Sequence, residues 1–289
     1  MRLRSVELEL PDSPAAAAFM RDVWGLLPAG TRSRTTYLRG TGDHPYLLAL
    51  AESAAPAIAS VTFSGSAGEL DALHGRISAA GMPAPARIAE FDNPGGGGGF
   101  VVRGAENQTF RFVAEVARAA PLEDRDRPLQ LTHVVLNALD RDACAGFAID
   151  ALGFRLADRT GHMSFVRCNR AHHALAFARS EVASLNHIAF EMADLDAVMK
   201  NIGRLRDLGL QPAWGPGRHG PGNNVFGYFI TPFGATVEYT AEIQQVDDSY
   251  RVGTPEDWKW PPNRIDHWGI SNRDHGRLGE AERTFRFRA

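Results

Sequence analysis

Three residues in the second half of the chain carry the side chains that a metal centre requires. His133 and His187 each lie in a short apolar stretch, and Glu238 lies in an alternating stretch that also reads as a strand. Two imidazoles and one carboxylate on a common face leave about three coordination positions of a metal ion free. Free positions allow a substrate and dioxygen to bind side by side. The set is therefore typical of non-haem Fe(II) oxygen chemistry, with Mn(II) as the alternative metal.

A long internal repeat divides the chain into two similar halves. F-M-R-D-V-W-G at 19–25 recurs as F-A-I-D-A-L-G at 147–153, a shift of 128 residues. T-F-R-F-V-A-E-V at 109–116 recurs as T-V-E-Y-T-A-E-I at 236–243, a shift of 127 residues. Because the two shifts agree over about 100 residues, we expect a duplicated fold.

A shorter repeat divides the second half again. L-T-H-V-V-L at 131–136 resembles L-N-H-I-A-F at 185–190, and Asp140 and Asp194 follow at the same distance. Each unit reads as an apolar strand, a helix that begins after the Asp and ends near a Gly, and then three strands. Strands outnumber helices and mostly follow one another, so the predicted class is α+β. We expect two similar domains, each of two βαβββ modules that form a curved, mostly open, barrel-like sheet.

The halves are joined and followed by segments of different composition. The charged stretch 121–128 is bracketed by prolines and suits a linker. The expected domains are residues 1–120, without a metal site, and residues 129–245, with the catalytic site. A tail follows at 246–289; its tryptophans favour a covering arm or an interface segment.

The repeat also indicates which half carries the chemistry. In the first half, the positions equivalent to the three metal-ligand candidates hold residues that bind a cation poorly. The equivalent pairs are His133 with Ser5, His187 with Ser60 and Glu238 with Arg111. We therefore place the predicted metal site in the second half alone.

A wider set of residues resembles a known signature. Gly217-Arg218-His219, Tyr228, Thr231-Pro232-Phe233-Gly234 and Glu238 are similar to the signature of the type I extradiol ring-cleavage dioxygenases of the vicinal oxygen chelate superfamily. The spacings of nine and ten residues between His219, Tyr228 and Glu238 fit that signature. The paired modules resemble the architecture of the same family, so the resemblance covers about residues 1–245.

The resemblance implies an activity and a role for each site residue. It implies an Fe(II)-dependent enzyme that cleaves the ring of a catecholic substrate with O₂, with the metal held by His133, His187 and Glu238. It implies that His172 is the acid–base histidine and that His219 and Tyr228 form hydrogen bonds to substrate and oxygen. Strand alternation predicts that the neighbouring His173 points to the opposite face and is not catalytic.

Departures from the signature leave the substrate open, and the range of the superfamily leaves the reaction open. Gly227 stands where the family has a bulky residue, and the small Pro221 and Gly222 follow His219. One alternative is an enzyme of the same superfamily that uses a divalent metal as a Lewis acid, such as an isomerase or a transferase. Another is a non-enzymatic protein that binds aromatic ligands.

Composition excludes several other classes. The 289 residues include 31 Lys and Arg and 34 Asp and Glu, a net charge of −3 that gives no basis for binding nucleic acid. Two cysteines are too few for a disulfide framework, and no apolar run is long enough to span a membrane. We expect a cytoplasmic protein that does not enter a membrane. Strand edges and the tryptophan-rich tail favour a homo-oligomer.

Overall fold

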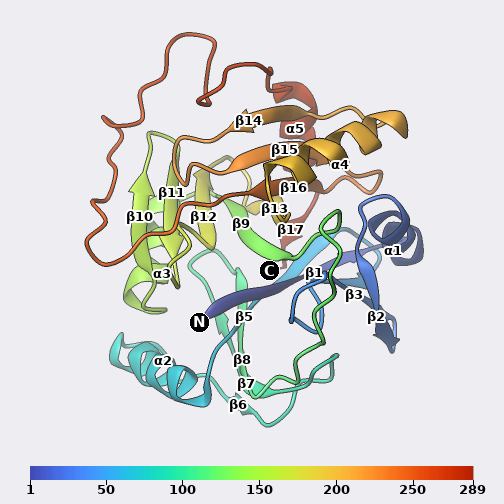
Figure 1. Cartoon of the computed structure of the whole chain (residues 1–289). Helices are drawn as coiled ribbons and strands as arrows, with labels where there is room; N and C mark the ends of the chain where they lie inside the picture. The colour runs from blue at the N-terminus through green and yellow to red at the C-terminus, as the bar shows by residue number, and fades with distance from the viewer. Residues whose placement is uncertain (289) are drawn as a thin grey trace.

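The structure is a computed structural model and describes residues 1–288 (Figure 1). Four βαβββ modules follow one another, which confirms the predicted fold class. The first comprises β1 (Arg2–Leu10), α1 (Ser13–Asp22), β2 (Leu27–Arg32), β3 (Thr35–Arg39) and β4 (Leu48–Glu52). The second comprises β5 (Ala57–Ser64), α2 (Ala67–Ala79), β6 (Arg87–Ile88), β7 (Gly98–Arg103) and β8 (Thr109–Ala114).

The second half repeats this order. Its modules comprise β9 (Gln130–Ala138), α3 (Arg141–Asp150), β10 (Arg155–Arg159), β11 (Met163–Arg167) and β12 (Leu175–Arg179), then β13 (Ser184–Glu191), α4 (Leu195–Asp207), β14 (Trp214–Arg218), β15 (Val225–Ile230) and β16 (Thr236–Ala241). The tail adds α5 (His275–Ala281) and β17 (Arg286–Phe287). We propose that the modules pair into the two domains expected at 1–120 and 129–245.

The helices of the second half begin and end as the sequence predicts. The Asp140 carboxylate accepts hydrogen bonds from the backbone N–H groups of the first turn of α3, and Asp194 does the same for α4. Such caps satisfy N–H groups that have no partner within a helix. Gly153 and Gly209 follow the two helices with φ of +71° and +83°, a conformation that glycine adopts at little cost.

The strands pair in the same way in both halves. β1 pairs antiparallel with β5, and β9 pairs antiparallel with β13. The last strand of each module pairs in parallel with the first strand of that module, as β4 does with β1 and β16 with β13. In the second half, α3 packs against β10 to β12 and α4 packs against β15 and β16, so the helices cover one face of the sheet. The helices lie on the outside of the sheets in Figure 1.

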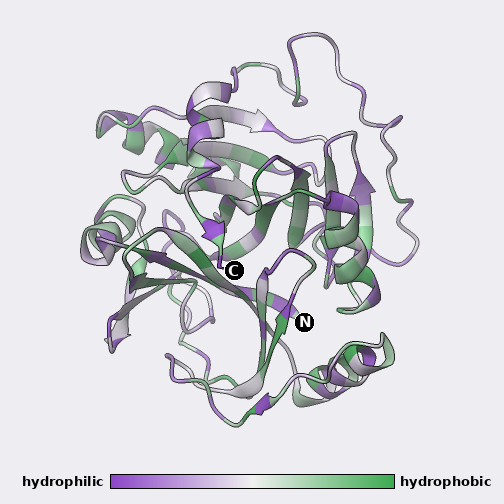
Figure 2. Cartoon of the chain, turned by 180° about the vertical axis from the view of Figure 1, so that it is seen from behind, coloured by the Kyte–Doolittle hydropathy of each residue, from purple (hydrophilic) through white to green (hydrophobic). Residues whose placement is uncertain are grey.

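The two halves share a hydrophobic core. Trp24 of the first half is fully buried and stacks on Tyr239 of the second, with ring centroids 3.7 Å apart. Phe63 packs edge-on against Phe154 across the same boundary. Hydrophobic residues concentrate on the strands, whereas the long C-terminal loop is drawn mostly in purple and pale tones (Figure 2). Among residues 1–288, no helix has the length and apolar character needed to cross a membrane.

The tail returns to the boundary between the halves. After residue 241 it runs along the outside of the second half as a long loop and then forms α5 (Figure 1). β17 then pairs with both halves, because Arg286 lies opposite Ser184 of β13 and Ala57 of β5. The segment expected to be a covering arm is therefore fixed to the sheet at its end.

Candidate metal centre and active site

Three neighbouring strands bring His133, His187 and Glu238 together. β13 lies between β9 and β16, and its Ala189 is paired with His133 on one side and with Glu238 on the other. His187 lies two residues before Ala189, so its side chain points to the same face. All three side chains are buried. Within the described part of the chain, this is the one cluster of His, Cys, Asp or Glu that could hold a metal ion.

The distances within this cluster suit a shared metal ion. Nε2 of His133 lies 3.3 Å from Nε2 of His187 and 3.1 Å from Oε2 of Glu238. Nε2 of His187 lies 3.2 Å from the same carboxylate oxygen. Nitrogen and oxygen ligands about 2.1 Å from one ion lie about 3.0 Å apart at bond angles near 90°. The three residues therefore fit one divalent ion, and His133 and His187 also line a pocket.

A chain of amide side chains orients His187. Nδ2 of Asn137 donates to the backbone oxygen of Glu282, which leaves its Oδ1 to accept from Nδ2 of Asn186 at 2.8 Å. Oδ1 of Asn186 then accepts from Nδ1–H of His187 at 2.7 Å. The imidazole is thereby held with the Nε2 lone pair toward the cluster, the tautomer a metal ligand needs. No pattern in the sequence indicated this role of Asn137 or Asn186, apart from the position of Asn186 next to His187.

Glu238 is also oriented by an amide. Nδ2 of Asn224 donates to Oε1 of Glu238 at 3.3 Å and to Oγ1 of Thr240 at 2.7 Å. Burial raises the pKa of Glu238, but the charges and hydrogen bonds of His133 and His187 outweigh burial and hold the pKa well below its ordinary value. The carboxylate is therefore ionised and ready to bind a cation.

His219 and Tyr228 lie together at one side of the cluster. Nε2 of His219 is 3.0 Å from the Tyr228 hydroxyl, which is 3.5 Å from Nε2 of His187. Burial lowers the pKa of His219 to about 3, so its imidazole is neutral at pH 7. Burial and the charge of Glu238 raise the pKa of Tyr228 well above its ordinary value, so the phenol keeps its proton and can donate it in a hydrogen bond.

The structure reverses the expected placement of His172 and His173. His173 lines the pocket, and its ring centroid is 4.3 Å from that of His133. His172 points away from the pocket, and its Nε2 lies 2.9 Å from Oδ2 of Asp158. The prediction that His172 faces the site and His173 faces away is therefore wrong. Burial, followed by the charges of the neighbouring histidines, lowers the pKa of His173 well below its ordinary value.

A β-bulge at the start of β12 causes this reversal. Leu175 is paired with Val166, and the N–H of Ala174 also donates to the oxygen of Val166. Ala174 and Leu175 thus both lie opposite Val166. Both side chains pack into the main core instead of pointing to opposite faces of the strand. Ala176, which faces the pocket side, is consequently on the same side as His173 and not His172.

The pocket beside the cluster has a volume of about 340 Å³. Its inner wall holds His133, His187, His173, His219 and Tyr228, and Phe165 adds an aromatic face. The tail forms the outer wall with Trp258, Trp260, Ile265, Arg273, Leu278 and Glu282. The covering role expected for the tail therefore includes contact with whatever occupies the pocket.

An ion pair from the tail lies at the edge of this pocket. Nη2 of Arg273 is 2.8 Å from Oε1 of Glu282, and the guanidinium lies 5.5 Å from the ring of Trp214. Burial raises the pKa of Glu282 and Arg273 opposes that shift. The pair adds hydrogen-bonding groups to a mostly aromatic wall without adding net charge. Nothing in the sequence of the tail indicated this contact.

The departures from the family signature have packing reasons. Gly222 has a φ of +82°, and a Cβ at this position would lie 3.0 Å from Cε1 of His173. A side chain here would press on the pocket histidine. Gly227 allows α4 to approach β15, because a Cβ there would lie 2.6 Å from Cδ1 of Ile202.

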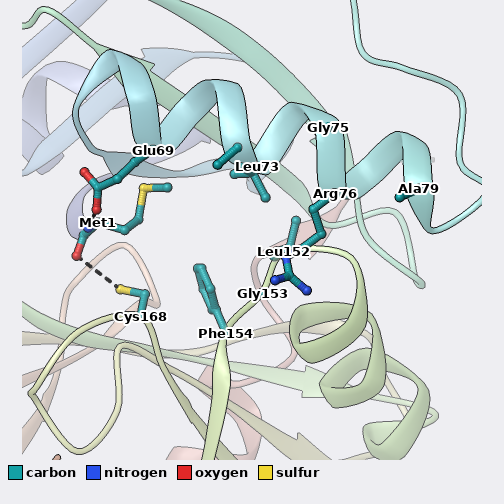
Figure 3. A pocket seen from close by; sticks show the side chains of 11 residues that line it. Met1, Glu69, Leu73, Gly75, Arg76, Ala79, Leu152, Gly153, Phe154 and Cys168 are labelled. Carbon is teal, nitrogen blue, oxygen red and sulfur yellow. Dashed lines mark hydrogen bonds and ion pairs between the residues drawn. The ribbon is translucent and has the colours of Figure 1, made fainter.

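A second, larger cavity of about 590 Å³ lies elsewhere, between α2 and the end of α3 (Figure 3). Leu73 and Arg76 line it from α2, and Phe154 and Cys168 line it from the second half. Burial raises the pKa of Cys168 to about 12, so this thiol stays protonated and is a poor nucleophile. The cavity does not include the histidine and carboxylate cluster and is not a candidate for the same chemistry.

Comparison with known proteins supplies the family. Residues 130–239 match the model of the Glyoxalase/Bleomycin resistance protein/Dioxygenase superfamily. The Mn(II)-bound glyoxalase from Novosphingobium aromaticivorans superposes with a TM-score of 0.87 and is 33% identical, over 96% of this chain and 93% of that one. This chain belongs to that superfamily.

Two curated relatives of the chain are named as dioxygenases. Metapyrocatechase 2 of Cupriavidus necator is 34% identical over 122 residues, 41% of this chain and 38% of that protein. The iron-dependent extradiol dioxygenase of Rhodococcus jostii is 27% identical over 210 residues, 63% of this chain and 69% of that protein. The match thus spans well under half the length of metapyrocatechase 2.

Proposed function

We propose that the protein is a metal-dependent extradiol dioxygenase that cleaves a catecholic ring with O₂. The observation that supports this most is the buried cluster of His133, His187 and Glu238, which faces a pocket that also holds His173, His219 and Tyr228. The resemblance to metapyrocatechase 2 and to an iron-dependent extradiol dioxygenase supports the same reaction. Fe(II) is the proposed metal.

Each side chain of the pocket has a task in this reaction. His133, His187 and Glu238 would hold a divalent ion, which would supply the positive charge that favours a deprotonated catechol and the redox chemistry with O₂. His173 is neutral and next to His133, so it can take a proton from a substrate hydroxyl and return it later. This proposal transfers the acid–base role from His172 to His173.

Tyr228 and His219 act on the opposite side. The protonated Tyr228 hydroxyl can donate a hydrogen bond to a substrate oxygen that carries negative charge, and His219 orients that hydroxyl across 3.0 Å. The tail tryptophans Trp258 and Trp260 line the pocket. Binding of an aromatic ring suits these walls because planar rings pack well against one another.

A second candidate is a Lewis-acid reaction of the glyoxalase type. The similarity over nearly the whole chain to a Mn(II)-bound glyoxalase favours it. Nitrogen and carboxylate ligands accept Mn(II) as well as Fe(II), so the metal ligands do not separate the two reactions. A Lewis-acid isomerase does not consume O₂, and this difference decides between them.

Oxygen uptake tests the proposal directly. Protein loaded anaerobically with Fe(II), and separately with Mn(II), is mixed with catechol, 3-methylcatechol or 2,3-dihydroxybiphenyl in the presence of O₂. We expect one O₂ consumed per catechol and a yellow ring-opened product. The Glu238→Ala protein treated with the same metal controls for oxidation of catechol by free iron. Tight metal binding without O₂ uptake on any catechol would contradict the proposal and favour the Lewis-acid reaction.

A further inference from the structure

A row of three buried polar side chains leads from the tail to the pocket. Oδ2 of Asp158 lies 2.9 Å from Nε2 of His172, and Nδ1 of His172 lies 3.0 Å from Nδ1 of His173. Asp158 and His172 are both 0% exposed, and His173 is 3% exposed. Asp158 and His172 lie outside the pocket, so the row joins two hidden residues to a third that can contact the substrate.

The donors and acceptors in this row determine which ring nitrogen of each histidine carries a proton. A carboxylate can only accept, so Nε2 of His172 carries the proton that it shares with Asp158. With a single proton on its ring, His172 has a lone pair on Nδ1, which must accept the proton of Nδ1–H of His173. Nε2 of His173 is left without a proton. Among residues 1–288 no side chain or backbone group forms a hydrogen bond to this nitrogen, and His173 lines the pocket.

We propose that Asp158 and His172 are positioning residues that hold His173 in the tautomer with its Nε2 lone pair toward the substrate. This inference rests on the proposed function, because it assigns the free Nε2 to proton transfer with a catechol hydroxyl. An imidazole in the opposite tautomer presents N–H to the substrate and cannot take its proton. Loss of a correctly placed base costs roughly 10²- to 10⁴-fold in rate.

The first half shows that the fold does not require this row. Asp158 is paired with Phe165, and the equivalent pair in the first half is Gly30 with Tyr37. His44 is equivalent to His172 and is followed by Pro45, so the first half has neither the carboxylate nor the second imidazole. Nε2 of His44 is buried and has no hydrogen-bond partner. The complete row occurs in the half that also holds the metal-ligand cluster.

The carboxylate of Asp158 also holds the tail through hydrogen bonds. The variant that tests the inference, Asp158→Asn, must therefore keep these bonds. Oδ1 accepts from the N–H of Gly253 at 2.7 Å and from the Tyr250 hydroxyl at 3.2 Å. In Asp158→Asn the amide oxygen can keep these two bonds, and the NH₂ group then faces His172. His172 must accept from that group, its Nδ1–H donates to His173, and the proton of His173 moves to Nε2. The variant keeps the hydrogen bonds that hold the tail and reverses the direction of the hydrogen bonds between residue 158, His172 and His173.

Steady-state kinetics of the Fe(II)-loaded protein gives one readout. We expect Asp158→Asn to lower kcat by about 10²-fold, with KM for the catechol and metal content within about twofold of the wild type. Tyr250→Phe is the matched control, because it removes a different donor to Asp158 and should leave kcat unchanged. His172→Gln, whose amide can donate to Asp158 and accept from His173, should retain more activity than His172→Ala. An unchanged kcat in Asp158→Asn would overturn the inference.

The tautomer itself gives a readout that does not depend on turnover. In metal-free protein labelled with ¹⁵N-histidine, long-range ¹H–¹⁵N correlation spectra distinguish protonated from unprotonated ring nitrogens. We expect His173, assigned by its loss in His173→Gln, to be protonated on Nδ1 in the wild type and on Nε2 in Asp158→Asn. Protonation on Nε2 in the wild type would overturn the inference. The expected tautomers in a protein that cleaves no catechol would instead overturn the proposed function.

Discussion

The two halves place different side chains on the same sheet positions. In the second half Ala189 is paired with His133 and Glu238, and in the first half Thr62 is paired with Ser5 and Arg111. Where the second half gathers two imidazoles around a carboxylate, Nη1 of Arg111 lies 2.6 Å from Glu7, whose carboxylate is also 3.3 Å from the Ser60 hydroxyl. The same sheet positions thus carry a cluster suited to bind a cation in the second half. In the first half they carry an ion pair in which Arg111 is already the cation.

The first half uses the same interior space for packing. Arg4 is 1% exposed and lies over the ring of Tyr46 at 4.4 Å, which fills the region with a cation–π contact. A guanidinium at the position of the carboxylate, with a second close by, repels a divalent metal. The candidate metal centre therefore depends on a few side chains and not on the architecture, which both halves share.

The largest expected effect comes from removing the carboxylate that distinguishes the two halves. Glu238→Ala should abolish metal binding and turnover, because the cluster loses its charged ligand and keeps two buried imidazoles. Metal content after dialysis and the rate of oxygen uptake measure both. The matched variant is Arg111→Ala at the equivalent position, which should leave metal content and turnover unchanged. Metal retained by Glu238→Ala would show that the cluster is not the binding site.

A smaller effect is expected from the pocket histidine. His173→Phe should keep the metal and slow turnover by roughly 10²- to 10⁴-fold, because it removes the proposed acid–base group. The control is His44→Phe in the first half, which lies outside the pocket. Full activity of His173→Phe, together with loss in His172→Phe, would restore the role that the sequence assigned to His172.

The smallest effect concerns stability and pH. Burial lowers the pKa of His44 to about 4, so the folded state holds this imidazole neutral while the unfolded chain binds a proton near pH 6.5. The contribution of His44 to the free energy of unfolding is therefore complete above about pH 6.5 and is lost as the pH falls toward 4. At pH 5 the free energy of unfolding is lower by about 2 kcal/mol for this reason. Urea unfolding at pH 7 and pH 5 should show a smaller loss of unfolding free energy in His44→Gln than in the wild type. Equal losses in the two proteins would contradict a buried neutral His44.

The sequence predicted the features that depend on local pattern and repetition. The caps Asp140 and Asp194 and the order of elements follow from residue types at fixed spacing. The equivalence of Glu238 and Arg111 follows from the repeat, and the strand register agrees with it. The role of the metal-ligand candidates, the domain boundaries and the expected homo-oligomer stay predictions.

Features that depend on one inserted residue or on distant contacts could not be predicted. The bulge formed by Ala174 and Leu175 has no sequence signature, yet it decides which of two adjacent histidines enters the pocket. Asp158 is 14 residues from His172 and 95 from Gly253, and no periodicity links the three. Such contacts follow from the folded sheet and not from neighbouring residues.

The tail that covers the pocket is fastened at both ends. Gly253 is held by Asp158 near its start, and β17 is held between β5 and β13 at its end. Between these points the tail is held again at β14, where the N–H of His267 donates to the oxygen of Arg218, so the stretch between Gly253 and His267 is the part that supplies Trp258 and Trp260 to the pocket. Contacts with the occupant of the pocket can thus change within this one segment, while the candidate metal ligands remain on the sheet.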